Sequence, residues 1–404
     1  MLALLNANAL HIPLADKSIH CVVTSPPYWS LRDYKVNGQL GLESTIEEYV
    51  ANMVTVFREV WRILRDDGNV WLNLGDSYAG SSGQGGISDK QTSNRGSYHD
   101  GKPRGLASLK PKDLCGIPWR VALALQADGW WLRSDIIWSK TNPMPESVRD
   151  RPTKSHEYIF LLSKNKKYYW DQDAVRESCT KPLDRWGGDM IRKECEDIGY
   201  QDNPKSLNRA RDMRPDKAGR NIRSVWTIST QPYKGAHFAT YPIKLVEPCI
   251  KAGTSEYGVC PLCGAPWKRI VEDTPEYAKF KKQIDWNKDR GKSLTNGNEF
   301  GYLPGKKVAI KSQITVGWKP TCNCNREDVV PATVFDPFAG SGTTLLTAKQ
   351  LGRGGVGIDL SQEYLKLAYE RIGLKDLDEW ETGKKTNPIK KDLPLFETIE
   401  ANSH

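Results

Sequence analysis

The stretch TVFDPFAGSGTTLLTAKQLGRGGVGIDLS, residues 333–361, decides the fold. An apolar run, a glycine-rich turn, a helix-forming run and a second apolar run follow one another, which predicts a strand, a turn, a helix and a strand. This order is typical of the first half of a nucleotide-binding α/β unit. Gly340 and Gly342 permit a sharp turn close to a ligand, and the helix after them presents free N–H groups. Asp359 ends the second strand, where a carboxylate can accept hydrogen bonds from ribose hydroxyls.

Two better-known nucleotide motifs do not fit this turn. A P-loop requires a lysine after the last glycine, but Thr343 and Thr344 follow Gly342. A dinucleotide fingerprint requires a third glycine where Leu345 stands. Since an ordinary strand-to-helix turn also contains glycines, the meaning of this turn depends on a second motif.

The second motif is TSPPYW, residues 24–29, which follows the short apolar run that begins at His20. A loop after such a strand lies at the carboxyl edge of the sheet, where α/β enzymes bind ligands. Two prolines lack N–H donors, so the loop offers acceptors. An exocyclic amino group of a base is a poor nucleophile, and its catalyst must hold both N–H groups on acceptors. The Pro26 carbonyl and the Ser25 hydroxyl suit that task, and Tyr28 suits stacking on a flipped base. In isolation, the motif would be read as a rigid proline-rich loop.

The rest of the chain fits an α/β domain. Apolar spacing predicts helices over Ile46–Leu64, closed by Gly68, and near Ile117–Ala127. Strands are expected over Val70–Gly75 and near Trp131–Trp138 and Tyr158–Leu162. Residues 78–105 are rich in Gly, Ser, Asn and Asp and predict a loop.

Composition limits the classes of protein. The 404 residues suffice for one large domain with an inserted module, or for two domains. The 58 Lys and Arg exceed the 49 Asp and Glu, and the net charge of +9 favours a polyanionic partner. Neither a membrane helix nor a secretion signal is recognisable, so we expect a cytoplasmic, nucleoid-associated protein.

A basic segment between Lys205 and Arg223 is the first candidate for contacts with phosphates, although a solvated loop would have the same composition. The candidate nucleic-acid contacts are Trp29, Lys205, Arg209, Arg211, Arg214, Arg220 and Arg223.

Nine cysteines in a chain without a secretion signal argue against a disulfide framework. Cys260-Pro-Leu-Cys263-Gly264 resembles a zinc knuckle, and Cys322 and Cys324 supply a second pair. Four thiolates can complete a tetrahedral, structural zinc site. The long segment between the pairs leaves buried free thiols as the alternative.

Together, TSPPYW and DPFAGSG resemble the amino-methyltransferase family of DNA modification enzymes, in the group whose catalytic motif precedes its cofactor motif. The blocks EVWRILRDDGNVWLNLGDSY, KSHEYIFLLSKNKKYYWD, VWTIST and HFATYPIKLVEPCI extend the resemblance. It implies a circularly permuted, Rossmann-like methyltransferase fold with a seven-stranded sheet and S-adenosylmethionine as cofactor. Pro248-Cys249 resembles the Pro-Cys nucleophile of cytosine C5 enzymes, but Cys249 falls in an apparent helix away from TSPPYW, so we interpret it as a core residue.

The resemblance also implies roles for residues and regions. The catalytic residues are Ser25, Pro26, Pro27 and Tyr28. The cofactor-binding residues are Asn8, Thr24, Phe238, Pro242, Asp336, Pro337, Phe338, Gly340, Ser341, Gly342, Thr343 and Asp359. Relatives often carry Gly-Asp where this chain has Ala7-Asn8. The expected regions are a catalytic part (1–170), a target-recognition region (171–234), a cofactor-binding part (235–255 and 331–375), a zinc-ribbon-like insert (256–330) and a tail (376–404).

The favoured reaction is methylation of cytosine N4 in double-stranded DNA. Related enzymes often carry Ser at the position of Ser25 when cytosine is the target, and Asp or Asn when it is adenine. A hydroxyl can both donate and accept, whereas an ionised Asp only accepts. Adenine N6 methylation, an RNA substrate, and a zinc-containing DNA-binding protein without activity are the alternatives. A restriction endonuclease is an expected partner, and the protein is expected to be a monomer or a homodimer.

Overall fold

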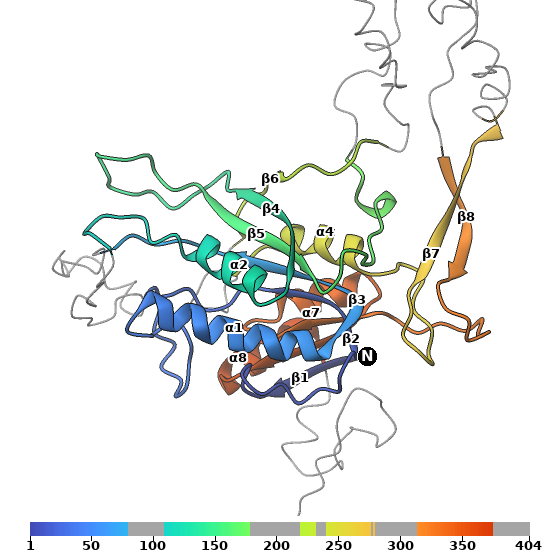
Figure 1. Ribbon diagram of the computed structural model, residues 1–404, viewed down its shortest axis with the longest axis horizontal. Helices are drawn as coiled ribbons and strands as arrows, with labels where there is room; N and C mark the ends of the chain where they lie inside the picture. Colours follow the sequence, from blue (N-terminus) through green and yellow to red (C-terminus); the bar gives the residue numbers. More distant parts are fainter. Residues whose placement is uncertain (80–108, 178–218, 232–239, 276–277, 279–312, 375–404) are drawn as a thin grey trace, which may run out of the picture. The chain divides into compact units, whose positions relative to one another are not determined.

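The structure is a computed structural model that describes residues 1–79, 109–177, 219–231, 240–275, 278 and 313–374 (Figure 1). The chain forms two compact units. The first comprises Met1–Asp171, Arg223–Trp267 and Pro320–His404, and it contains both motifs. The second comprises Gln172–Ile222 and Lys268–Lys319.

An eight-stranded sheet forms the centre of the described part of the first unit. In spatial order its strands are β1 (Leu2–Asn6), β10 (Gly354–Asp359), β9 (Thr333–Asp336), β2 (Ile19–Thr24), β3 (Leu64–Leu74), β5 (His156–Ser163), β4 (Trp131–Ser139) and β6 (Val225–Thr227). The strand β5 is antiparallel to β3 and β4, and the other neighbours are parallel. The sheet is therefore the mixed α/β sheet that a Rossmann-like fold requires.

The expected count of seven strands is wrong by one. The eighth strand, β6, pairs with β4 and comes from the region expected to recognise the target. Its central residue, Trp226, is buried, and the centroid of its ring lies 6.1 Å from the centroid of the Trp71 ring. Three residues are too few for a strand to be recognised by alternation, so only the tertiary contacts reveal it.

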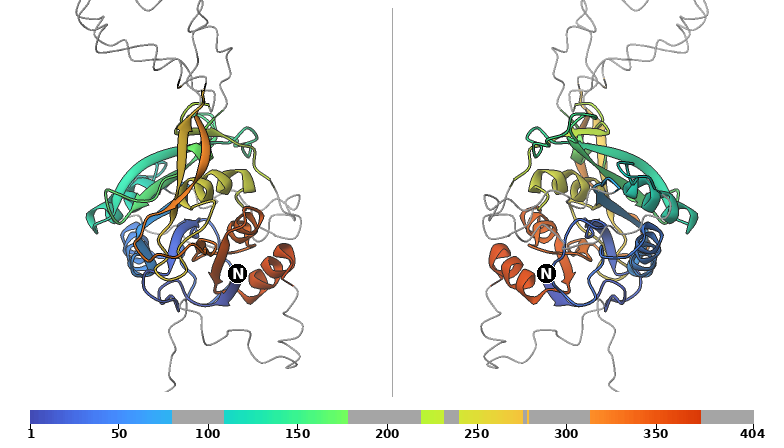
Figure 2. Two further views of the ribbon diagram at one scale, coloured as in Figure 1. Left: turned by 90° about the vertical axis from the view of Figure 1, so that its right-hand side faces the viewer. Right: turned by 90° about the vertical axis from the view of Figure 1, so that its left-hand side faces the viewer.

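Helices cover both faces of the sheet (Figures 1 and 2). One layer contains α1 (Ile46–Ile63) and α2 (Ile117–Ala127), and the other contains α4 (Ile243–Gly253), α7 (Thr343–Gln350) and α8 (Gln362–Ile372). The side chain of Thr45 caps α1 by accepting from the Glu48 N–H. Both predicted helices of the first layer are confirmed, but the predicted end of the first is wrong, because α1 ends at Ile63 and Gly68 lies within β3. Among the described residues, every helix is too short or too polar to span a bilayer.

The strand β3 is longer than expected. It begins at Leu64, which is fully buried and pairs with Ile19 of β2, rather than at Val70. The charged residues Arg65, Asp66 and Asp67 interrupt the apolar pattern there and concealed this part of the strand.

The described part of the second unit is small. The strands β7 (Trp267–Asp273) and β8 (Gln313–Pro320) form a two-stranded sheet, in which the Arg269 guanidinium lies over the Trp318 ring. A 3-10 turn, η2 (Asp173–Val175), precedes a backbone bridge between Glu177 and Arg220.

Candidate functional site

The two motifs meet at one edge of the sheet. Cys21 and Val22 of β2 pair in parallel with Val334 and Phe335 of β9, so TSPPYW and DPFAGSG leave neighbouring strands in the same direction. Ligands of open α/β sheets bind at this carboxyl edge. The two motif loops therefore lie at the same edge of the sheet, on neighbouring strands.

The Asp336 carboxylate links the TSPPYW loop to the DPFAGSG loop. Its carboxylate accepts from the hydroxyls of Thr24 (2.7 Å), Tyr241 (2.8 Å) and Thr344 (2.8 Å) and from the Phe338 N–H (3.0 Å). It is fully enclosed, and burial raises its pKa. Thr24 is equally enclosed. The side chains of Thr24 and Asp336 hydrogen-bond to each other, and the cofactor-binding roles that the resemblance implies for both residues stay predictions.

The glycine-rich turn adopts the predicted conformation. Gly340 and Gly342 have φ of +49° and +75°, in the left-handed region that favours glycine. A Cβ at Gly342 would lie 2.9 Å from the Cβ of Ala368, so α8 also packs too closely for a side chain. Before the turn, Pro337 is buried and Phe338 is partly buried.

Arg371 of α8 braces this turn, a role that the sequence did not predict. Its guanidinium donates to the hydroxyls of Ser341 (2.8 Å) and Thr343 (2.8 Å). Both hydroxyls, expected at the cofactor, therefore already accept a charged hydrogen bond from the protein.

Asp359 lies at the end of β10, as predicted. Its carboxylate accepts from the backbone N–H groups of Gly340 (2.9 Å) and Ser361 (2.8 Å), and burial raises its pKa. A carboxylate has about four acceptor positions, so some remain for hydroxyl donors. The rings of Tyr34 and Tyr364 meet edge to face, with centroids 6.2 Å apart, and burial together with the nearby Asp359 carboxylate raises the pKa of both tyrosines. The sequence indicated neither tyrosine.

Two other expected cofactor residues lie near the motif strands. Asn8 follows β1, the neighbour of β10, and its side-chain oxygen accepts from the Leu10 N–H (2.9 Å). Pro242 is buried at the N-terminus of α4, next to Tyr241. Phe238 lies outside the described residues.

The proline carbonyls of TSPPYW differ in their hydrogen bonding. The Pro27 carbonyl accepts from the Tyr49 hydroxyl (2.9 Å). In the part of the chain that the structure describes, no group donates to the Pro26 carbonyl. Pro26 therefore keeps the free acceptor that the motif predicts.

The prediction for Trp29 is corrected by the structure. Trp29 was expected to contact nucleic acid, but its side chain is 4% exposed and packs in the main core. Its indole N–H donates to the Glu43 carbonyl (3.1 Å). An aromatic residue directly after a ligand loop resembles a stacking residue in sequence, but here it anchors the loop.

A polar network surrounds Tyr28. Its hydroxyl lies 2.7 Å from Glu157 Oε2 and 3.2 Å from Asn73 Oδ1, and the Ser25 hydroxyl lies 3.3 Å from it. Lys140 forms an ion pair with Glu157. Burial and the nearby Glu157 raise the pKa of Tyr28 well above its usual value. Asn73, Lys140 and Glu157 were missed, although polar residues at the ends of buried strands were a signal for them.

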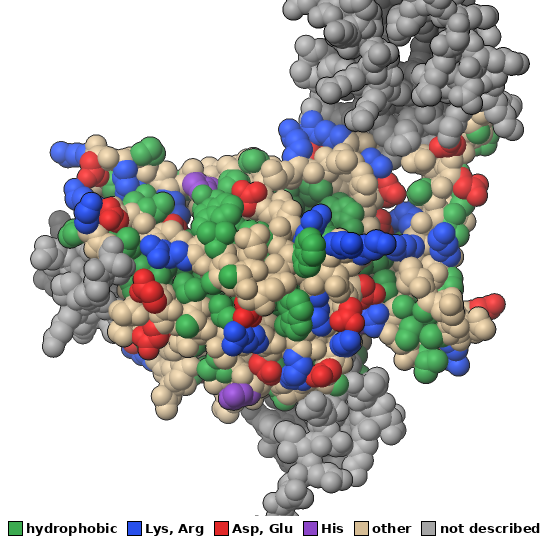
Figure 3. All heavy atoms as spheres, in the orientation of Figure 1, with side chains coloured by type: hydrophobic (Ala, Val, Ile, Leu, Met, Phe, Trp, Pro, Cys, Tyr) green, Lys and Arg blue, Asp and Glu red, His purple; other side chains and the backbone are tan. Residues whose placement is uncertain are grey.

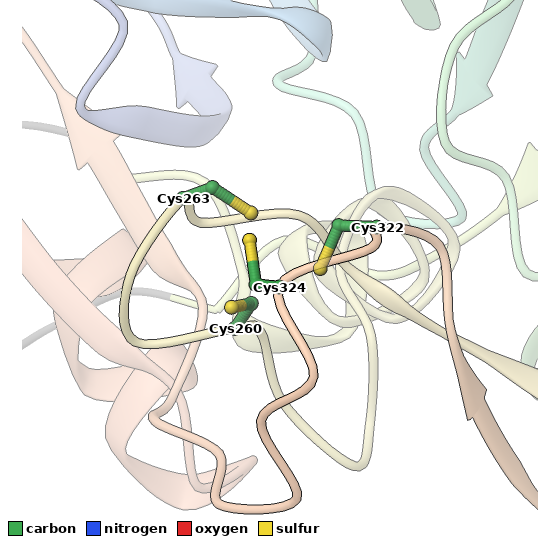
Figure 4. Close-up of side chains that lie close together, drawn as sticks. All are labelled: Cys260, Cys263, Cys322 and Cys324. Carbon is green, nitrogen blue, oxygen red and sulfur yellow. The ribbon is translucent and has the colours of Figure 1, made fainter.

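The four predicted metal ligands come together in the first unit. The sulfur atoms of Cys260, Cys263, Cys322 and Cys324 all lie within 4.8 Å of one another, and Figure 4 shows the four side chains close together. The N–H of Gly264 donates to the Cys260 carbonyl (2.8 Å) in a tight knuckle, where Gly264 has a φ of +69°. The backbone N–H of Cys263 lowers the pKa of Cys260 to about 7, which favours a thiolate.

The knuckle is attached to the central sheet. His20 Nδ1 accepts from the Thr333 N–H (3.0 Å), so Nε2 carries the proton and donates to the Gly264 carbonyl (3.0 Å). Arg65 of β3 donates to the Cys263 carbonyl (2.6 Å). Burial, followed by the charge of Arg65, lowers the pKa of His20 to about 4, so the ring is neutral at pH 7.

Few of the expected nucleic-acid contacts fall in the described structure. Lys205, Arg209, Arg211 and Arg214 lie outside the described residues. Arg220 pairs with Glu177 (2.9 Å), and the Arg223 carbonyl accepts from the Trp226 indole (2.7 Å). On the face in Figure 3, basic and acidic side chains are interspersed.

Cys249 is a core residue, as predicted. It lies in α4, is 2% exposed and donates from its sulfur to the Leu245 carbonyl. Burial raises its pKa well above the usual value, which is the opposite of what a nucleophilic thiolate requires.

The parallel strands, the glycine turn (residues 337–342) and the acceptor loop (TSPPYW, residues 24–29) together define a DNA methyltransferase of the amino-methylating class. The DNA methylase family model (N6_N4_Mtase) matches residues 19–261 and 326–370, and the chain belongs to this family. It is 39% identical over 359 residues to the type II methyltransferase M.SmaI of Serratia marcescens, covering 89% of this chain and 86% of that protein. It is 44% identical over 359 residues to M.XycI of Xanthomonas campestris pv. cyanopsidis, covering 89% and 83%.

Solved structures with a similar fold have low sequence identity. The PvuII DNA methyltransferase (cytosine-N4-specific) has a TM-score of 0.48 and 15% identity, covering 94% of this chain and 89% of that chain. The complex of M1.HpyAVI with SAM has a TM-score of 0.41 and 14% identity, covering 92% and 99%.

Proposed function

We propose that this protein transfers a methyl group from S-adenosylmethionine to the exocyclic N4 of a flipped-out cytosine in double-stranded DNA. The observation that carries the proposal is the pair of acceptors, Ser25 Oγ and the Pro26 carbonyl, on the loop beside the glycine turn. Two acceptors can hold both hydrogens of an amino group and stabilise the positive charge that develops on its nitrogen. Cytosine is favoured over adenine because serine begins the SPPY tetrapeptide.

The residues at the sheet edge fit S-adenosylmethionine. A Cβ at Gly340 would meet only the Phe338 carbonyl oxygen, at 3.9 Å, and Asp359 keeps acceptor positions for ribose hydroxyls. The cofactor supplies an electrophilic methyl group. The chain supplies orientation: Asp359 holds the ribose, Arg371 keeps the turn in shape, and Asp336 fixes the distance between the two loops.

The cysteine cluster fits a structural zinc ion. Four sulfurs at tetrahedral positions about 2.3 Å from zinc would lie about 3.8 Å apart, close to the arrangement present here. Cys260, Cys263, Cys322 and Cys324 would hold the ion, with no position left for substrate.

The order of the motifs supports a circular permutation. The first strand of the cofactor unit, β9, comes late in the chain but lies beside β2 in the centre of the sheet. We assign target recognition to residues 171–234 and propose a restriction endonuclease partner, because the relatives are named type II methyltransferases.

Methyl transfer is tested directly with isotopically labelled S-adenosylmethionine. We expect label to enter duplex DNA and not RNA of the same sequence. Ser25→Ala should lower the rate while cofactor affinity is retained, with Ser18→Ala, at a half-buried serine before β2 whose hydroxyl donates to the Ala15 carbonyl, as the matched control. Cofactor binding without transfer to DNA or RNA would reject the enzyme and support the inactive DNA-binding alternative.

A further inference from the structure

Glu157 lies at the centre of the network behind the acceptor loop. Its side chain, 13% exposed, accepts from the Tyr28 hydroxyl at 2.7 Å and from the Asn73 amide at 3.2 Å. Lys140, 20% exposed, pairs with its other oxygen. These residues come from β3, β5 and the end of β4, so the sheet itself fixes the position of the carboxylate.

The hydrogens of the two hydroxyls can be assigned in order. A tyrosine hydroxyl has one hydrogen, and the short, charge-assisted bond to Glu157 takes it in preference to the 3.2 Å contact with Asn73. Tyr28 can then only accept from the Ser25 hydroxyl, 3.3 Å away. Ser25 has thereby used its only hydrogen, and its remaining lone pairs face away from Tyr28.

We infer that Glu157 is a positioning residue that acts through Tyr28 to make Ser25 Oγ an obligatory acceptor. An obligatory acceptor pairs with an exocyclic amino group and repels an exocyclic carbonyl. The network therefore selects cytosine over uracil, or adenine over hypoxanthine, at the flipped position. This replaces the expectation that serine is used because it both donates and accepts. The inference rests on the proposed function.

The test measures selectivity and not activity. Once the modified position has been mapped, the affinity for duplexes with cytosine or uracil there is measured by titration in the presence of S-adenosylhomocysteine. Replacing cytosine by uracil also weakens the duplex itself, but this effect is the same for every protein variant. The quantity that tests the inference is therefore the change, from one protein variant to another, in the ratio of the affinities for the two duplexes. Tyr28→Phe removes the oxygen that accepts the Ser25 hydrogen, and it should reduce the preference for cytosine about tenfold. Glu157→Gln keeps one acceptor oxygen for Tyr28 and weakens the bond that orders its hydrogen, so it should reduce the preference less. Glu59→Gln, which alters a carboxylate paired with Arg62 on α1, should leave the ratio unchanged.

Tyr28→Phe keeps the ring and removes only the oxygen, so it serves if Glu157→Gln does not fold. If Tyr28→Phe weakens binding to both duplexes equally, so that the affinity ratio is unchanged, Glu157 does not act on Ser25 through Tyr28, and the inference is wrong. If mapping finds methyladenine, the cytosine assignment fails, and the relay is tested with adenine and hypoxanthine instead.

Discussion

The Thr24 hydroxyl donates a 2.7 Å hydrogen bond to the Asp336 carboxylate, joining the two motif loops across 312 positions of the chain. The bond is fully buried, and the same carboxylate also binds Tyr241 and Thr344. The acceptor loop and the glycine turn are therefore fixed to one buried group.

Asp336→Ala should destabilise the protein strongly. It removes the acceptor of the Thr24 hydroxyl and the Phe338 N–H, whereas Thr344 keeps the Val23 carbonyl and Tyr241 keeps the Thr344 hydroxyl. Each buried donor left without a partner costs about 1–3 kcal/mol, and the space left by the side chain adds to the loss. We expect a loss of more than about 3 kcal/mol of unfolding free energy in urea. Asp150→Ala, which breaks an exposed pair with Lys112, should change it by less than about 1 kcal/mol. Equal effects of the two substitutions on the unfolding free energy would show that Asp336 does not hold the two motif loops together.

Asp359→Ala should weaken S-adenosylmethionine binding about tenfold or more. Since Asp359 also holds Gly340 and Ser361, affinity loss alone does not identify a ribose contact. A double-mutant cycle identifies the ribose contact by comparing two ligands, S-adenosylhomocysteine and its analogue without ribose hydroxyls, in calorimetry. The wild type should bind the analogue more weakly, and Asp359→Ala should bind the two ligands with the same affinity. Additive losses would mean that Asp359 only shapes the turn.

Elemental analysis should find close to one zinc per chain. The double substitution Cys260→Ser and Cys263→Ser should lose it, whereas Cys115→Ala, at a buried core thiol, should retain it. Because His20 and Arg65 bind the knuckle, chelation should also lower the melting temperature of the whole first unit. Freshly purified protein without zinc would contradict the assignment.

His20 should make stability depend on pH. Its pKa is about 4 when folded and about 6.5 when unfolded, so the unfolded chain binds more protons between these values. The contribution is fully present above about pH 6.5 and is lost as the pH falls toward 4, by about 3 kcal/mol in all. His20→Gln should show a correspondingly flatter pH dependence of unfolding free energy, with both proteins measured at the same total zinc concentration so that loss of zinc at low pH affects them alike. Parallel curves for the two proteins would disprove a neutral, buried His20.

The sequence predicted the features that depend on local chemistry. The left-handed glycines, the position of Asp359 and the gathering of four cysteines follow from motifs of a few residues each. The helix Ile46–Ile63 follows from its apolar spacing.

Contacts between distant segments were not predictable. The sequence does not show that Arg371 reaches Ser341 or that Glu157 reaches Tyr28, because the packing of α8 on the glycine-rich turn and the order of the strands bring these residues together. Trp29 was misjudged for a similar reason, because the carbonyl that binds its indole belongs to a later loop.

The central claim is tested most directly by the product. DNA methylated by the purified protein is digested to nucleosides, which are identified by mass spectrometry against authentic standards. We predict N4-methylcytosine, absent from DNA treated with Ser25→Ala. N6-methyladenine as the sole product would contradict the cytosine assignment.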